Sequence, residues 1–503
     1  MYPRRRCAII GPKRAAGRNP RIHELRNILG GLAWAVLGAF ALALTLYVMQ
    51  ARRMPDLQPW HENLLDADFQ AEDAGETLRE YRAREERLLR EVRERVQADA
   101  ITGAQLNRFV PGSPSHPDSL GTNWNRTFVF DPPRVRGSAL LLHGLSDSPY
   151  SLRAVGEQLR AKGFYVVGLR IPGHGTIPGA LARATWRDWQ AAVRVGARDA
   201  AAHAGSGPFI IVGYSNGAAL AVDYTLEALD GAEDTAAPAR LILFSPALGV
   251  ARAAALARFQ RWLARLPGLH KLGWTNVLPE YDPYKYNSFP IEAGEQIYAL
   301  TKEVNRRIAA RRKRGTLHEL PPVLAFQSVV DATIPAGSII HQLLDYLPAN
   351  GSELVLFDVN HRTAAEDLMR PEPAALLRRV MESTERAYGV TIVTNERDDS
   401  RTVVARSRGS GEAEWTEAPL GAQWPRGVYS LSHVALPFPP DDPLYGTREH
   451  ARDTRFSLGA LELHGESGVL VVSPAQLMRL RFNPFFDYVA QRIDAALSAA
   501  ATP

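Results

Sequence analysis

Cysteine is nearly missing from this chain of 503 residues, which has only Cys7. The low count excludes a small secreted domain held together by disulfides. Charged residues make up only 22% of the chain against 46% hydrophobic residues, which excludes a disordered protein, and 39 glycines are far too few for a collagen-like repeat. The length suits two to four ordinary domains, or one large α/β domain with insertions.

The net charge of +5 is concentrated near the N-terminus. Residues 1–27 contain eight Lys or Arg and one Glu, a balance of +7, and Arg52 and Arg53 add two more. Subtracting these nine charges leaves −4 for residues 54–503. The bulk of the protein is therefore mildly acidic, and we expect no nucleic-acid partner.

An uncharged apolar run, residues 28–49, separates the two basic clusters. As a helix it would be roughly 33 Å long, enough to cross a bilayer. A cleavable signal peptide is the alternative, but its apolar region is usually shorter and residues 48–52 have no A-x-A-like site. We expect an uncleaved anchor over 28–50, a cytoplasmic tail over 1–27 that includes Cys7, and the remainder on the periplasmic or extracellular side.

Residues 51–122 read as a linker followed by a charged helix. The helix is predicted over residues 68–98, where apolar side chains form only a thin stripe. One interpretation is a spacer or partner-binding helix. We favour a solvated helix that packs along the domain by one edge. Protein partners are not indicated by the sequence.

From residue 138 short apolar runs alternate with segments of helical composition, such as residues 152–161 and 186–202. Strands buried on both faces have this texture, which predicts an α/β fold with a mainly parallel sheet flanked by helices. Chemistry in such sheets gathers at the carboxyl ends of the strands. The predicted strands are residues 138–142, 165–169, 209–212, 241–244, 323–326 and 354–357.

The strand 209–212 runs into Gly213-Tyr214-Ser215-Asn216-Gly217 and then into an Ala-rich helix. This is G-x-S-x-G between a strand and a helix, where a sharp turn exposes the serine hydroxyl above the sheet. Ser215 is therefore the candidate nucleophile.

The strand 138–142 ends in His143-Gly144-Leu145. Acyl transfer needs backbone N–H groups directed at the developing oxyanion, commonly one after the nucleophile and one in a loop after an earlier strand. Here these are the N–H groups of Asn216 and Leu145. We interpret His143 as a residue that shapes the loop, in preference to a proton-transfer role.

Four motifs, LLLHGLSDSPYS, LRIPGHG, TWRDW and GYSNG, occur in this order and spacing. Together they resemble the α/β-hydrolase superfamily, most closely its monoacylglycerol lipase, lysophospholipase and carboxylesterase branch, which includes serine aminopeptidase-like members. The resemblance covers roughly residues 123–361. It implies an α/β-hydrolase domain over 123–503, a Ser, Asp, His triad in that chain order, no metal and no cofactor.

Asp331, in QSVVDATIP at the end of a buried strand, occupies the family's position for the acid. Two histidines compete for the base. His361 lies 30 residues after Asp331, the usual interval in the superfamily, whereas the Ser-His-Val around His433 resembles the catalytic loop of related esterases. After His433 comes the helical segment 485–497, which resembles the closing helix of the fold, so we favour His433.

Two insertions follow from this choice. Residues 362–428 would be an insertion that contains a hairpin over 390–408, turning at Asp398 and Asp399. Residues 246–320 are too long for a simple loop and form either a cap with an apolar acyl pocket or a helical insertion whose aromatics pack on the sheet. The aromatics are Phe259, Trp262, Trp274, Tyr281, Tyr284, Tyr286 and Phe289. The basic run 306–314 is interpreted as a solvated helix face in preference to a contact with anionic lipid.

Together these features predict a membrane-anchored serine hydrolase. We expect it to cleave carboxylic esters. The favoured substrates are lipid-like, such as a lysophospholipid or a monoacylglycerol, and another small ester is the other possibility. A peptidase or amidase of the same fold is the nearest alternative. A non-catalytic, membrane-anchored binding module is the alternative from a different class, and the intact GYSNG context disfavours it.

Overall fold

The structure is a computed structural model with two compact units, Met1–Met54 and Pro55–Pro503. It describes residues 20–97, 106–249, 263–362, 370–383, 385–447, 456–459 and 469–500, and the single residues 260, 368, 449 and 461. Cys7, most of the basic tail, Phe259 and Trp262 lie outside the described residues.

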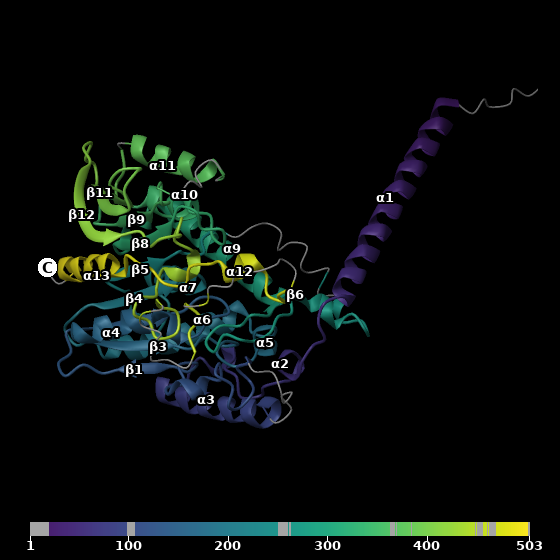
Figure 1. The fold of residues 1–503 in the computed structure, drawn as a ribbon, viewed down its shortest axis with the longest axis horizontal. Coiled ribbons are helices and arrows are strands. Elements are labelled where there is room, and N and C mark those ends of the chain that lie inside the picture. Colours follow the sequence, from purple (N-terminus) through teal and green to yellow (C-terminus); the bar gives the residue numbers. More distant parts are fainter. Residues whose placement is uncertain are drawn as a thin grey trace, which may run out of the picture. The chain divides into compact units, whose positions relative to one another are not determined.

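The first unit is one long helix, α1 (Pro20–Arg52), drawn in purple in Figure 1. Its segment Ile28–Met49 has 22 residues, none of them buried. An apolar helix with no buried face lacks the protein contacts of a core helix. Its length and composition fit a membrane anchor or a signal sequence.

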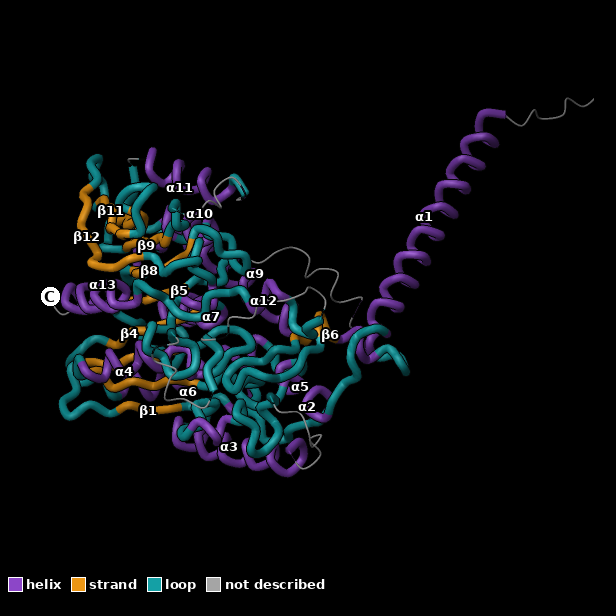
Figure 2. Tube along the Cα trace, viewed as in Figure 1, coloured by secondary structure: helices purple, strands orange, loops and turns teal. Residues whose placement is uncertain are grey.

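The second unit is built on a ten-stranded sheet with the order β1-β3-β2-β4-β5-β8-β9-β10-β11-β12 (Figure 1). A separate two-stranded sheet is formed by β6 and β7. Figure 2 shows β6 among the loops. The strands are β1 (Phe128–Phe130), β2 (Gly137–Leu142), β3 (Phe164–Leu169), β4 (Phe209–Tyr214), β5 (Arg240–Phe244), β6 (Trp274–Asn276), β7 (Phe289–Pro290), β8 (Val323–Ser328), β9 (Glu353–Phe357), β10 (Gly389–Asn395), β11 (Thr402–Arg408) and β12 (Thr416–Gln423).

The predicted α/β-hydrolase architecture is confirmed. All six expected strands are present as β2, β3, β4, β5, β8 and β9, and every neighbouring pair among them is parallel. Nearly every residue of these strands is buried. Their continuous Val, Ile and Leu runs follow from this burial, because helices cover both faces of the sheet.

Side chains of one strand alternate between two cores. In β2, Leu140 and Leu142 belong to the core beneath α6, α7 and α9, whereas Ala139 and Leu141 belong to the core beneath α4 and α13. The helices are α2 (Pro59–Glu62), α3 (Leu78–Val92), α4 (Arg153–Ala161), α5 (Pro178–Leu181), α6 (Trp186–Ala202), α7 (Asn216–Leu229), α9 (Ile291–Arg314), α10 (Gly337–Gln342), α11 (Glu372–Glu382), α12 (Pro474–Leu477) and α13 (Phe486–Ala500).

The hairpin expected over 390–408 is present as β10 and β11, which pair antiparallel. It also joins the main sheet, because β10 runs parallel to β9, and β12 continues the sheet beyond β11. Residues between 362 and 428 therefore extend the sheet by three strands.

The charged helix begins later than predicted. α3 starts at Leu78, where Thr77 accepts a hydrogen bond from the backbone N–H of Glu80 and Glu80 caps Thr77 in return. After α3 the helix widens into a π-helical turn, Arg93–Gln97. The predicted apolar stripe is buried, so α3 packs along the domain by one edge.

The buried side chain of Arg170 links the segment that contains α3 to the sheet. Arg170, which directly follows β3, lies 3.0 Å from Asp68 Oδ1 and 3.0 Å from Glu85 Oε1. Glu85 also accepts hydrogen bonds from the N–H and hydroxyl of Thr127, at 3.0 and 2.7 Å. Tyr81 donates to the Arg170 carbonyl at 2.6 Å. The described residues between Pro55 and residue 122 are thus part of the same compact unit as the sheet.

We expect Arg170→Met to lower the free energy of unfolding by roughly 3–5 kcal/mol, because it leaves the buried Glu85 without its cation. Urea denaturation followed by circular dichroism measures the change. Arg397→Met is the matched control, since the Arg397–Asp399 pair is 71% and 81% exposed and should contribute less than about 1 kcal/mol. Equal stability of the two variants would contradict the structural role of Arg170.

Candidate active site

Ser215 occupies a strained turn between β4 and α7. Its backbone has φ 54° and ψ −112°, a conformation that residues with a Cβ seldom adopt. Its N–H donates to the Phe244 carbonyl at 2.8 Å, and its own carbonyl accepts from Ala218 at 3.1 Å. The side chain is only 8% exposed. The predicted sharp turn between strand and helix is therefore present.

The two glycines of GYSNG are required by close packing. A Cβ on Gly213 would lie 2.5 Å from the Ala218 Cα, and one on Gly217 would lie 1.9 Å from the Leu142 carbonyl oxygen. Neither neighbour is a side chain that can rotate away. The helix can approach the strand this closely only because both positions lack a side chain.

Asp331 follows β8 and is held by four hydrogen bonds. Its Oδ1 accepts from the N–H groups of Thr333 and Ile334, both at 2.8 Å. Its Oδ2 accepts from Gln327 Nε2 at 2.9 Å and lies 2.7 Å from His433 Nδ1. Burial alone would raise the pKa of Asp331, but the His433 charge and these hydrogen bonds outweigh it and lower the pKa. The carboxylate is therefore ionised at neutral pH.

His433 reaches this carboxylate because the loop before it is tied to the ends of β8 and β9. Ser328 donates to the Leu431 carbonyl at 2.6 Å. Asn360 donates to the carbonyls of Val428 and Tyr429, in each case at 2.8 Å. These hydrogen bonds hold the backbone of residues 428–431 against the ends of β8 and β9.

His433 also lies against the residue that precedes the serine. The rings of Tyr214 and His433 have centroids 5.3 Å apart, and the Tyr214 hydroxyl donates to the His433 carbonyl at 3.4 Å. Asp331 binds Nδ1, so Nε2 is the imidazole nitrogen left for a reacting group. The structure thus pairs His433 with Asp331 and places the imidazole against Tyr214, the residue before Ser215.

His361, the competing histidine, has a different carboxylate partner. Its Nε2 lies 2.8 Å from Asp358 Oδ2, and the same oxygen accepts a hydrogen bond from Thr394 at 2.8 Å. Its backbone N–H donates to Asn395. Of the two histidines, the structure pairs His433 with Asp331.

The two predicted oxyanion donors come from the start of α7 and from the loop after β2. Asn216 is fully buried and is the first residue of α7, where backbone N–H groups have no partner within the helix. Leu145 lies in the loop after β2. His143 shapes that loop, because its Nε2 accepts from the Ile171 N–H at 3.0 Å and its Nδ1 donates to the Gly144 carbonyl at 2.9 Å. Burial lowers the pKa of His143 well below its usual range, so it stays neutral.

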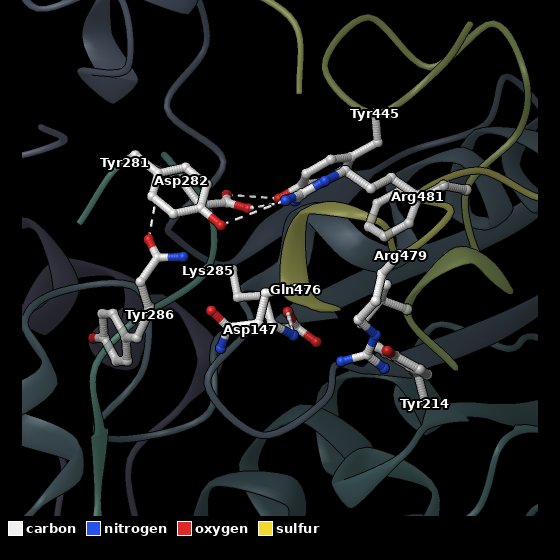
Figure 3. Close-up of a pocket in the computed structure, with 13 residues that line it drawn as sticks. Asp147, Tyr214, Tyr281, Asp282, Lys285, Tyr286, Tyr445, Gln476, Arg479 and Arg481 are labelled. Carbon is white, nitrogen blue, oxygen red and sulfur yellow. Dashed lines mark hydrogen bonds and ion pairs between the residues drawn. The ribbon is translucent and has the colours of Figure 1, made fainter. Parts of the chain in front are cut away.

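A pocket of about 110 Å³ adjoins these residues (Figure 3). It contains Tyr214 and Val434, the chain neighbours of Ser215 and His433. Its remaining walls come from residues 281–287, which belong to the predicted cap region, and from segments near the C-terminus. The full lining is Asp147, Tyr214, Tyr281, Asp282, Lys285, Tyr286, Asn287, Val434, Phe438, Tyr445, Gln476, Arg479 and Arg481.

Glu280 holds in shape the pocket wall formed by residues 281–287. Its carboxylate accepts from the N–H groups of Asn287 at 2.9 Å and Ser288 at 2.8 Å, and its carbonyl accepts from Arg108 at 2.8 Å. Complete burial raises the pKa of Glu280 to about 7 despite these bonds. The shape of the pocket wall therefore depends on a buried carboxyl group that titrates near neutrality.

The basic run of α9 is ion-paired and partly buried. Arg306 and Arg307 both pair with Glu303, and Arg311 lies 2.6 Å from Asp230 with its side chain only 3% exposed. The expected solvated face is thus wrong for Arg311, which packs into the domain. Of the described aromatics in this region, Trp274, Tyr281, Tyr284 and Tyr286 are buried.

Several pocket residues were not anticipated. Lys285, Gln476, Arg479 and Arg481 belong to no motif, and the last three lie more than 40 residues after His433. Only the fold reveals them, because nothing in their local sequence distinguishes them from surface residues.

Residues 133–358 match the sequence model of the family described as "Serine aminopeptidase, S33", which covers a little under half of the chain. A search of the curated proteins found no match.

Solved structures with a similar fold include a metagenome-derived lipolytic enzyme, 19% identical over 51% of this chain and 98% of that chain, with a TM-score of 0.37. The Paleococcus ferrophilus monoacylglycerol lipase is 19% identical over 46% of this chain and 88% of its own, with a TM-score of 0.35. A soluble variant of the Saccharomyces cerevisiae monoglyceride lipase is 12% identical over 46% and 81%, with a TM-score of 0.34.

The expected resemblance is confirmed: residues 133–358 match this family model, and the sheet and its helices have the α/β-hydrolase fold. It is an enzyme of the serine hydrolase class, and the match supports an ester hydrolase activity.

Glu280→Gln tests the titration of this pocket wall. A carboxyl group whose pKa rises from 4.5 unfolded to about 7 folded stabilises the fold below pH 4.5, and this contribution is lost as pH rises through 7. The free energy of unfolding of the wild type, measured relative to Glu280→Gln by urea denaturation, should therefore fall between pH 5 and pH 8 by up to about 3 kcal/mol. A difference that does not vary with pH would disprove the raised pKa.

Proposed function

We propose that this protein is a membrane-anchored serine hydrolase that cleaves carboxylic esters of lipid-like substrates through Ser215, Asp331 and His433. The observation that carries the proposal is the 2.7 Å contact between His433 Nδ1 and Asp331 Oδ2, made beside the strained turn that presents Ser215. A residue held at positive φ between two obligatory glycines costs stability, which a purely structural turn does not require.

The chemistry follows from the groups present. Ser215 Oγ attacks the ester carbonyl while His433 Nε2 removes its proton. The imidazolium then protonates the departing alcohol and leaves an acyl-enzyme on Ser215. Water, deprotonated by the same histidine, hydrolyses that intermediate and restores the serine.

Asp331 and the oxyanion donors support these steps. The carboxylate fixes the imidazole with Nδ1–H toward itself, so Nε2 is the basic nitrogen, and it stabilises the imidazolium. The N–H groups of Leu145 and Asn216 are proposed to bind the oxyanion, at roughly 3 kcal/mol of transition-state stabilisation per donor. No metal or cofactor takes part in this scheme.

Pocket charges favour an ester over an aminopeptidase substrate. An aminopeptidase must bind the ammonium group of its peptide, for which a carboxylate is the natural partner. Of the acids that line the pocket, Asp147 lies 2.9 Å from Lys285 Nζ and Asp282 lies 3.6 Å from Arg481 Nη1. Both are already paired with cations, which weakens the attraction that either could offer an ammonium group.

Lipid-like substrates fit two further features. Aromatic and apolar side chains make up much of the pocket lining, Tyr281, Tyr286, Phe438 and Tyr445 among them. The apolar segment Ile28–Met49, read as an anchor, would keep the enzyme where lipid esters are concentrated. A lysophospholipid and a monoacylglycerol both meet these requirements.

Variants of the triad test the mechanism. Ser215→Ala and His433→Ala should each lower kcat on p-nitrophenyl butyrate by at least about a thousandfold, because nucleophile and base are lost. Ser215→Ala should also abolish labelling by a fluorophosphonate probe. His361→Ala is the matched control and should keep turnover within a fewfold of wild type. Normal turnover in His433→Ala, or labelling that survives Ser215→Ala, would refute the assignment.

Membrane topology is tested separately. A C-terminal alkaline phosphatase fusion should be active and a C-terminal green fluorescent protein fusion dark in bacterial cells, since the positive balance before the apolar segment keeps the N-terminus in the cytoplasm. The fusion should stay in the membrane fraction at full length if the segment is an anchor. Release of a shortened, soluble protein would instead identify a signal sequence.

A further inference from the structure

Three cations and two carboxylates line the pocket beside Ser215 and His433. Lys285 is paired with Asp147, and Arg481 is paired with Asp282, which also accepts a hydrogen bond from the Tyr445 hydroxyl at 2.6 Å. Figure 3 shows Asp282, Arg481 and Tyr445 joined on one wall. These pairings leave one positive charge in the pocket, that of Arg479.

Arg479 has only a neutral partner among the described residues. Its Nη2 donates to Thr333 Oγ1 at 3.4 Å, a long hydrogen bond, and no carboxylate of the described part of the chain lies within 4.0 Å of it. A guanidinium carries five N–H donors in a planar fork. Its position therefore leaves most of those donors directed at the pocket or at solvent.

Arg479 is placed close to the reacting groups. Thr333 is two residues from Asp331, and its N–H is one of those that hold the Asp331 carboxylate. On its other side Arg479 faces Tyr214, the residue before Ser215, and its charge opposes the rise in the Tyr214 pKa that burial causes. Figure 3 shows the guanidinium directed toward Tyr214. A group bound there would belong to the molecule that Ser215 attacks.

We propose that Arg479 binds a negatively charged group of the substrate, a carboxylate or a phosphate, and so makes the enzyme selective for anionic esters. The inference rests on the proposed ester hydrolysis and specifies its substrate class. A guanidinium matches both groups with two parallel hydrogen bonds, which are stronger in a partly desolvated pocket than in water. A neutral ester of the same size leaves the charge without a partner.

The test compares esters that differ in charge. The substrates are 3-butyryloxybenzoate, its neutral methyl ester and 3-butyryloxyphenyl phosphate, with release of the phenol followed by absorbance. Arg479→Gln should lower the ratio of kcat/KM for anionic over neutral ester at least tenfold, because the paired charge is lost. Arg479→Lys should recover part of the ratio. The anionic ester, carboxylate or phosphate, whose kcat/KM falls more in Arg479→Gln carries the group that Arg479 prefers.

Arg397→Gln, an arginine on the exposed β10–β11 turn, is the matched control and should leave the ratio unchanged. An unchanged ratio in active Arg479→Gln would overturn the proposal while ester hydrolysis stands. Binding to the Ser215→Ala protein gives a readout that needs no turnover: calorimetry with 3-butyryloxybenzoate should show at least tenfold weaker binding when Arg479→Gln is added. Equal affinities would overturn the proposal even for an enzyme that fails to hydrolyse these esters.

Discussion

A continuous series of backbone hydrogen bonds across the ends of neighbouring parallel strands positions the site. The Ser215 N–H donates to Phe244 at the end of β5, the Ser245 N–H donates to Phe326 in β8, and the Val329 N–H donates to Phe357 at the end of β9. Each loop begins by bonding to the strand beside it. Ser215 and Asp331 are therefore fixed relative to each other by the register of the sheet, and only His433 comes from outside this series.

Because the ends of parallel strands position Ser215 and Asp331, these two residues could be predicted from the sequence more readily than His433. Ser215 and Asp331 lie at the ends of strands whose apolar runs are conspicuous, so their placement follows from local pattern and parallel topology. His433 has no such support, since it lies in a loop held by Ser328 and Asn360, and its identification needed a resemblance to related esterases. The sequence alone could not decide between His433 and His361. The structure distinguishes them, because His361 pairs with Asp358 and His433 pairs with Asp331.

Other features depend on contacts that local sequence does not encode. β12 contains Pro419 and Gly421 and is largely exposed, so it lacks the alternation of a typical strand, and only its pairing with β11 makes it one. The helix predicted from residue 68 begins at Leu78 because Thr77 caps it, although the preceding residues have helical composition. Arg479 is distinguished as the pocket cation without an acidic partner only because Lys285 and Arg481 pair with acids more than 100 residues away along the chain.

The bond between Asp331 and His433 also sets an order of events during synthesis. The two residues are separated by 102 positions, and the segments that complete the pocket follow later still. All ten strands of the main sheet and the strained serine turn precede the imidazole along the chain. A chain that stops short of residue 433 therefore lacks both the imidazole that pairs with Asp331 and the helix α13, which covers one face of the sheet.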